Sequence, residues 1–117
     1  VRVTPAKDKA FNDQFFPWLN VSDGGVLGVT WMDRRNDPAN INYEEFGTTS
    51  SSGGSSFDPN LKLADTPSDP WNDGFGGFFI GDYTGNSWTH DSSPKLYAIW
   101  TDTRTFQDQA EVGGLIP

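Results

Sequence analysis

Two pairs of aspartate and arginine have a spacing that could do chemistry. The pattern Trp-x-Asp-x-Arg occurs at 31–35 and again at 100–104. In each copy the Asp and the Arg are two residues apart, so on a strand they share a face and can form an ion pair. A guanidinium also matches a ligand carboxylate in a bidentate way, which makes Arg35 and Arg104 candidate ligand contacts. Because the pattern occurs twice, we interpret it first as a structural feature, the end of a strand, that is repeated in the fold.

A tyrosine preceded by an aspartate is the second candidate for chemistry. Asp82 and Tyr83 stand in the sequence GDYTG. Because the ordinary pKa of tyrosine is about 10, a tyrosine nucleophile needs a nearby carboxylate to take its proton. Neighbouring residues of a strand point to opposite faces. The structural alternative is therefore a tyrosine hydroxyl that binds the backbone of a tight turn.

A further grouping of tyrosine with carboxylates consists of Tyr43, Glu44 and Glu45. A glycosidase that uses paired carboxylates needs two acids facing each other across a cleft. Neighbouring residues alternate between the faces of a strand, so we expect one of the two glutamates to face solvent. The pattern favours an acidic outer strand.

Residues that commonly bind metals are sparse. The chain has no cysteine and a single histidine, His90, in a polar sequence, which disfavours a transition-metal site. Aspartates and asparagines at 22–25, 34–40 and 67–74 suit a hard cation, so calcium is a possible cofactor. None of these segments has the EF-hand spacing, and we identify no other cofactor.

Tryptophans that reach the surface could stack on sugar rings. Trp18, Trp71 and Trp88 are the candidates for such a glycan-binding role. The sequence Asn-Val-Ser that starts at Asn20 is an acceptor site for N-glycosylation if the chain is secreted by a eukaryote.

The composition excludes two classes of partner. The formal net charge is −8, and the eight basic residues are scattered, whereas a nucleic-acid binder usually carries a basic patch. No apolar run approaches the roughly 20 residues that a membrane-spanning helix needs. Hydrophobic residues make up only 34% of the chain but aromatic residues 15%, so we expect a core built from rings, which bury large areas each.

Short β-prone segments between turn residues must position these groups. Helical periodicity is absent, and Gly, Pro, Ser, Asn and Asp recur every few residues. We expect strands at 1–3, 15–21, 26–33, 41–49, 61–64, 78–83, 95–102 and 110–116, and a long loop at 65–77. Pro17 indicates an edge or a bulge in its strand. Many short strands with regular turns predict an all-β sandwich, barrel or propeller.

The sequence SSSGGSSF at 50–57 resembles the Asp-box turn, Ser-x-Asp-x-Gly-x-Thr-Trp, of sialidase-like (BNR-repeat) β-propellers. Its positions are filled by Ser50, Gly54, Ser56 and Phe57. Ser52 stands where the aspartate of the box is expected. The sequences FFPWLNV, GVTWMDRRNDP, FFIGDYTG and YAIWTDTR also resemble segments of this secreted family, and the similarity spans about residues 11–114.

The resemblance implies a fold of antiparallel four-stranded blades, each with the Asp box between its third and fourth strands. Residues 1–117 would form one incomplete propeller segment with blades at about 11–64 and 78–117. Propellers close with about four to eight blades. We therefore expect that further blades of the same protein, or further copies of the chain, complete the ring.

The resemblance implies a secreted, extracellular protein that acts on glycans or binds them. As an exo-glycosidase of the sialidase type, it would use Tyr83 with Asp82 in catalysis, and Arg35 with Arg104 on a substrate carboxylate. One alternative is a non-catalytic glycan-binding propeller module. Another is a structural subunit that assembles through exposed strand edges into a ring or a filament.

Overall fold

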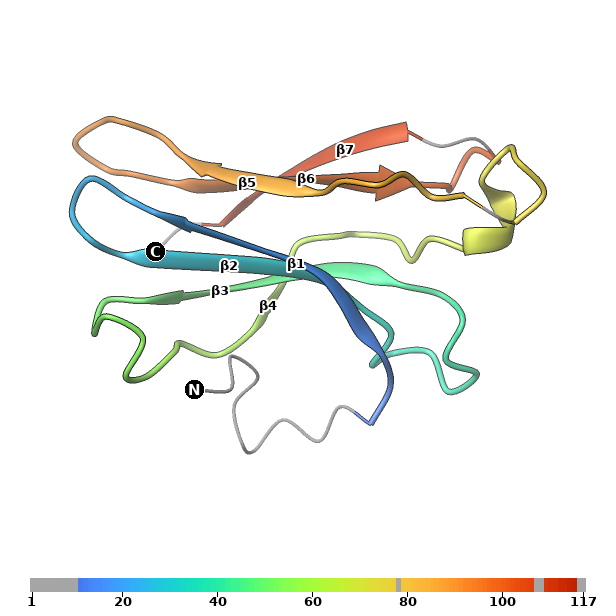
Figure 1. Cartoon of the computed structure of the whole chain (residues 1–117), viewed down its shortest axis with the longest axis horizontal. Helices are drawn as coiled ribbons and strands as arrows, with labels where there is room; N and C mark the ends of the chain where they lie inside the picture. Colours follow the sequence, from blue (N-terminus) through green and yellow to red (C-terminus); the bar gives the residue numbers. More distant parts are fainter. Residues whose placement is uncertain (1–10, 78, 107–108, 116–117) are drawn as a thin grey trace.

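The computed structural model describes residues 11–77, 79–106 and 109–115, and in these residues the chain forms two antiparallel sheets (Figure 1). Sheet 1 has the order β1-β2-β3-β4 and sheet 2 the order β5-β6-β7. The strands are β1 (Gln14–Val21), β2 (Leu27–Asp33), β3 (Glu44–Ser50), β4 (Leu61–Lys62), β5 (Gly85–Trp88), β6 (Leu96–Asp102) and β7 (Gln109–Leu115). The predicted all-β class is confirmed. The strand predicted at 1–3 lies outside the described residues.

The first strand contains the irregularity that Pro17 predicts. The pairing of β1 with β2 shifts register between Phe15 and Trp18. Proline has no backbone N–H to donate to the sheet, and an extra residue in one strand accommodates it at an edge. The four strands predicted at 15–21, 26–33, 95–102 and 110–116 are present as β1, β2, β6 and β7.

Three expectations about the strands are wrong. Residues 79–83 form no strand, because Phe79 N–H donates to the Asp73 carboxylate at 2.7 Å and Gly81 takes a φ of 90°. No strand was expected at 84–94, where the structure has β5; with it, sheet 2 has three strands in the described residues, the number expected after residue 77. The strand predicted from residue 41 begins at Glu44, because the amides of residues 41 and 42 donate to the Asp37 side chain.

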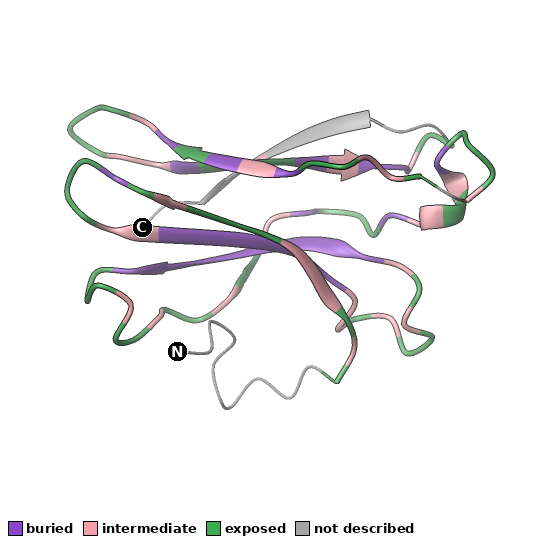
Figure 2. Ribbon diagram, in the orientation of Figure 1, coloured by how far each residue is buried: buried purple, intermediate pink, exposed green. Residues whose placement is uncertain are grey.

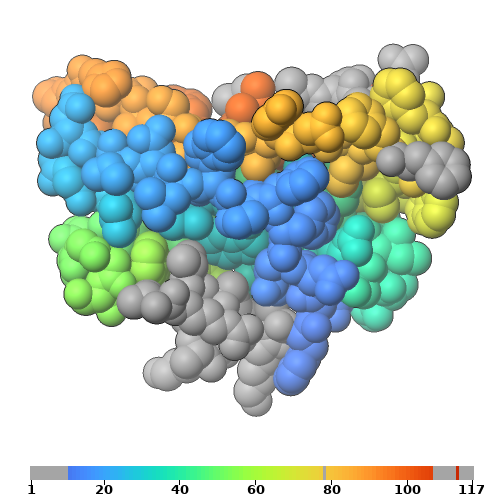
Figure 3. All heavy atoms as spheres, in the orientation of Figure 1, coloured from blue at the N-terminus to red at the C-terminus, as the bar shows by residue number. Residues whose placement is uncertain are grey.

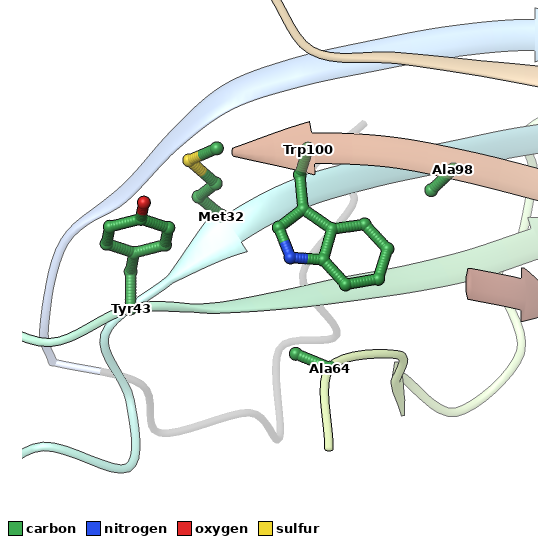
Figure 4. Close-up of a cluster of buried hydrophobic side chains, with 5 residues drawn as sticks. All are labelled: Met32, Tyr43, Ala64, Ala98 and Trp100. Carbon is green, nitrogen blue, oxygen red and sulfur yellow. The ribbon is translucent and has the colours of Figure 1, made fainter. Parts of the chain in front are cut away.

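The two sheets pack face to face over a core that is rich in rings. Figure 4 shows the Trp100 ring reaching from β6 toward the strands of sheet 1. The buried cluster consists of Met32, Tyr43, Ala64, Ala98 and Trp100. The sheets approach so closely that a Cβ atom at Gly28 would lie 2.5 Å from a methyl carbon of Leu96. The side chains of Leu96 and Trp88 in sheet 2 therefore fill the space above Gly28 of sheet 1.

Burial differs between the two sheets. In sheet 1, β2 and β3 are buried along almost their whole length, on both faces (Figure 2). In β6, buried residues alternate with exposed ones, and Tyr97 and Ile99 are 42% and 46% exposed. Sheet 2 therefore packs one face against sheet 1 and leaves its other face open at β6.

Hydrogen bonds fix the position of one sheet on the other. The Tyr43 hydroxyl donates to the Thr101 carbonyl at 3.0 Å. The Asn86 side chain donates to the Trp18 carbonyl at 3.0 Å and to the Thr30 hydroxyl at 3.1 Å.

Within the residues that the structure describes, no helix has the length and apolar character to cross a membrane.

Candidate functional site

An open hollow between the two sheets gathers three of the predicted site residues. It has a volume of about 230 Å³ and is lined by Phe16, Pro17, Trp18, Asp82, Tyr83 and Thr84. One wall belongs to β1 and the other to the segment that leads into β5. Figure 3 shows these two parts of the chain in contact, in blue and in golden orange. The sequence predicted Asp82 with Tyr83 as one candidate and Trp18 as another, and the fold brings both to the same hollow.

The bulge in β1 shapes the first wall. Phe16 takes a φ of 51°, a conformation that is uncommon for a bulky residue and marks a local constraint. This turn lets Phe15 and Phe16 both pack against the buried core, although neighbours on a regular strand point to opposite faces. Trp18 follows the bulge and is 44% exposed at the hollow.

The second wall is tied to both sheets. Thr84 donates through its hydroxyl to the Ile99 carbonyl at 2.8 Å. Asn86 holds the backbone of Trp18 across the junction, so the spacing of the two walls is set by a direct hydrogen bond. Tyr83 is 83% exposed, and Asp82 is also exposed. The wall thus presents one carboxylate and one phenol beside the Trp18 ring.

The chemistry of the hollow suits the recognition of a small ring. A mostly apolar surface with a few polar groups is the usual composition of a small-molecule site. Trp18 and Tyr83 offer ring surfaces for stacking. The Asp82 carboxylate accepts hydrogen bonds from hydroxyl groups.

In the first copy of the repeated motif, the arginine pairs with a buried aspartate. Asp33 is buried, accepts from Trp31 Nε1 at 2.8 Å and from the Arg35 backbone amide at 2.7 Å, and forms an ion pair with the Arg35 guanidinium. The same guanidinium lies 4.4 Å from the centre of the Phe46 ring. The ion pair expected from the spacing is confirmed, and Arg35 also covers the rings behind it.

The second copy ties a strand end to the long loop. Arg104 donates to the buried Asp102 from Nε at 2.9 Å and from Nη2 at 2.6 Å. Nη2 also lies 2.8 Å from a carboxylate oxygen of Asp65. The carboxylates of Asp102 and Asp65 raise the pKa of Arg104, and Arg104 lowers the pKa of Asp65. This predicted ion pair is also confirmed.

Two of the predicted stacking residues lie away from the hollow. Trp88 is 4% exposed and packs against Leu96 in the core, so its ring faces are covered by the protein. Trp71 is 62% exposed in the 3-10 turn η1 (Pro70–Asn72). Of the three tryptophans, only Trp18 lines the hollow.

The loop that carries Trp71 is organised by an aspartate that sequence analysis did not single out. Asp73 is completely buried, and its carboxylate accepts from the backbone amides of Phe75, Gly77 and Phe79 at 2.7–2.8 Å. An aspartate followed by Gly-x-Gly-Gly is the signal that could have indicated this turn.

The glycosylation sequon lies within the β1–β2 hairpin. The Asn20 side chain donates to the Asn86 carbonyl at 3.1 Å, and the Ser22 hydroxyl accepts from the Val26 amide at 3.0 Å. These groups already bind within the fold. Glycosylation of Asn20 stays a prediction.

The expectation that Glu44 or Glu45 faces solvent is wrong. Both are buried, because β3 is an inner strand of sheet 1. Glu44 is bound by Lys62 Nζ at 2.9 Å. Burial raises the pKa of Glu45 to about 8, and the hydroxyl of Thr30 offsets only part of this rise.

An acidic hollow of about 140 Å³ lies beside the first motif, lined by Asp33, Asn36, Asp37, Asn42, Glu44 and Pro67. Its carboxylates already have partners: Asp33 binds Arg35, Glu44 binds Lys62, and Asp37 accepts from backbone amides, which lower its pKa. In the described ranges, no group of three or more His, Cys, Asp or Glu residues is placed to hold a metal ion. Calcium binding stays a prediction.

Comparison of the chain with protein-family models, with curated protein sequences and with solved structures found no match. The class of protein therefore follows from the geometry alone. It is an all-β protein of two antiparallel sheets that pack face to face, with a hollow at their junction.

Proposed function

We propose that this chain is a glycan-binding module made of two successive blades of a β-propeller. The main support for glycan binding is the hollow at the junction of the sheets. Its lining includes Trp18, Asp82 and Tyr83. An exposed indole beside a carboxylate matches a sugar, which has apolar ring faces and hydroxyl edges. The fold by itself would not define such a function.

The arrangement of the strands supports the propeller half of the proposal. Each sheet is a meander in which strands pair in the order of the sequence, and the first strands, β1 and β5, contact each other. The repeated motif ends the second strand in both sheets, at β2 and at β6. Equivalent positions in two successive sheets are what repeated blades produce.

The hairpin that resembles an Asp box adds independent support. Residues 50–57 link β3 to β4, the third and fourth strands of sheet 1. Gly53 and Gly54 take φ values of 63° and 87°. Ser52 accepts from the Ser56 amide at 2.9 Å, as an aspartate at this position could. Phe57 packs against a buried cluster of sheet 1.

Hydrolysis of sialosides, which the resemblance implies, has weaker support than binding. A clamp for a substrate carboxylate needs arginines that can turn to the ligand. Arg35 and Arg104 instead bind the buried carboxylates of Asp33 and Asp102. Breaking such a pair would leave a buried charge uncompensated, which costs about 3–5 kcal/mol.

Assembly is a second candidate function, and the open face of sheet 2 favours it. In the register of the repeated motif, Tyr97 and Ile99 correspond to Gly28 and Thr30, which are buried in sheet 1. A further sheet of the same kind would cover this face. That sheet would belong to another blade of a longer protein or to another copy of the chain.

Glycan titration of the chain and of Trp18→Ala tests the binding function. We expect affinity to fall roughly tenfold or more in the variant, since removal of one buried ring costs about 1.5–3 kcal/mol. Trp71→Ala is the matched control, because Trp71 is exposed outside the hollow and its loss should leave the affinity unchanged. Near-ultraviolet circular dichroism checks that both variants are folded. Equal binding by the chain and Trp18→Ala would refute the site.

A further inference from the structure

We infer that the hollow beside Trp18 selects a neutral sugar ring and discriminates against sialic acid and other anionic sugars. This inference rests on the proposed glycan-binding function and names the class of ligand. It departs from the carboxylate-binding role that the resemblance implies for Arg35 and Arg104.

The charge of the hollow is the first argument. Asp82 is the only charged residue in the lining, and it is exposed. The other lining residues bring rings, a proline and a threonine whose hydroxyl already donates to Ile99. An anionic sugar in this hollow would therefore meet a like charge and no cation from the lining.

The arginines of the repeated motif are committed to other partners. Arg35 is paired with Asp33 and lies over Phe46. Arg104 donates to Asp102 at three positions when its backbone amide is included, and it also binds Asp65. Neither arginine lines the hollow.

The remaining basic side chains of the described residues do not line the hollow either. These are Arg34, Lys62 and Lys95. Arg34 lies 3.3 Å from an Asp13 oxygen, and Lys62 binds Glu44. The formal net charge of the whole chain is −8, so its long-range field also repels anions.

The dimensions of the hollow point to a single ring. Its volume of about 230 Å³ is below the roughly 300–1,000 Å³ of sites that enclose a drug-sized ligand. One sugar ring would stack on Trp18 while the rest of the glycan stays in solvent. Hydroxyl groups of that ring would donate to the Asp82 carboxylate, which an uncharged sugar can do without repulsion.

A pair of glycans that differ only in a terminal sialic acid tests the inference by calorimetric titration. The probes are three oligosaccharides that end in galactose, glucose or mannose, each compared with the form of the same oligosaccharide that carries one terminal sialic acid. We expect at least one neutral glycan to bind at least about threefold tighter than its own sialylated form at low salt, the effect of one like charge at about 6 Å in water. In 1 M salt, where charges are screened beyond about 3 Å, the preference should shrink.

The Asp82→Asn variant tests whether Asp82 causes the preference for the neutral over the sialylated glycan. We expect the preference to fall about threefold in this variant, because the like charge is removed while an acceptor oxygen is kept. Asp91→Asn is the control, since Asp91 is exposed in the β5–β6 hairpin and does not line the hollow. It should keep the parent's preference.

The outcomes separate this inference from the proposed function. Tighter binding of the sialylated glycan would overturn the neutral-sugar inference and leave glycan binding standing. A preference unchanged by Asp82→Asn would overturn it as well. Failure of every glycan to bind would overturn both.

Discussion

Glu45 is a carboxylic acid without exposed surface, held between the two sheets on β3. Its side chain faces the same way as that of Tyr43, which contributes to the inter-sheet core. A carboxylate at such a position loses its hydration, so the neutral acid is favoured. The pKa of Glu45 accordingly rises from 4.5 to about 8.

This shift makes the stability of the fold depend on pH in a defined direction. Between pH 4.5 and 8 the folded chain keeps a proton on Glu45 that the unfolded chain has released. The free energy of unfolding therefore falls as pH rises through this window, by up to about 1.4 kcal/mol per pH unit. Glu45→Gln replaces the neutral acid by a neutral amide, so it should remove this fall.

Chemical denaturation of the chain and of Glu45→Gln, at pH 5 and at pH 8, measures the effect. We expect the two proteins to differ by less than about 1 kcal/mol at pH 5, and the variant to be roughly 2–4 kcal/mol more stable at pH 8. Glu44→Gln is the control, because it removes the neighbouring acid bound by Lys62 and keeps Glu45. An identical pH slope in the chain and in Glu45→Gln would contradict the assignment.

At the scale of the elements, the close approach of β2 to sheet 2 depends on one glycine. A Cβ atom at Gly28 would lie 2.5 Å from Leu96 Cδ2 and 3.1 Å from Trp88 Cζ2. Both side chains are buried, and Leu96 has no exposed surface into which it could move. Even one added methyl group would therefore force strain into the junction.

Gly28→Ala should lower the free energy of unfolding by about 1–3 kcal/mol, the usual cost of overpacking a core. Denaturant titration followed by tryptophan fluorescence would measure it. Gly24→Ala is the matched control, since the nearest atom to a Cβ there is Ser22 Oγ at 3.8 Å. That change should stay within about 0.5 kcal/mol. A loss at Gly28→Ala no larger than that at Gly24→Ala would contradict the close approach of the sheets at this glycine.

At the scale of the whole molecule, the open face of sheet 2 has a consequence for assembly. The chain has a mass of 12.9 kDa, and Tyr97 and Ile99 are exposed on β6. We expect it to form larger assemblies at high concentration, by covering this face with a second copy. Ile99→Lys should shift the population toward the monomer, because it would bury an unpaired charge.

Light scattering during gel filtration measures these masses. Tyr83→Lys is the control, because Tyr83 is more exposed than Ile99 and lies at the hollow between the sheets. It should leave the distribution of masses as in the parent chain. A folded 12.9 kDa monomer at every concentration would contradict assembly through this face.

Local rules determined much of this protein from its sequence. The spacing of two residues predicted the ion pairs of Asp33 with Arg35 and of Asp102 with Arg104. In the structure each arginine lies in the turn after its strand, where its backbone amide also donates to the aspartate two residues earlier. Pro17 indicated the bulge in β1, and the glycines of the 50–57 hairpin indicated its turn. Each of these features depends on neighbours within a few residues.

Tertiary structure alone decided which side chains are buried and which of them meet. Trp18 and Trp88 have the same chemistry, yet one lines the hollow and the other lies in the core. The sequence pattern of Glu44 and Glu45 predicted an acidic outer strand. In the structure β3 is an inner strand, because β2 and β4 lie on its two sides. The meeting of Trp18 with Asp82 depends on how one sheet is placed on the other, through Asn86 and the space above Gly28. Packing between residues far apart in the chain sets that placement, and no local pattern encodes it.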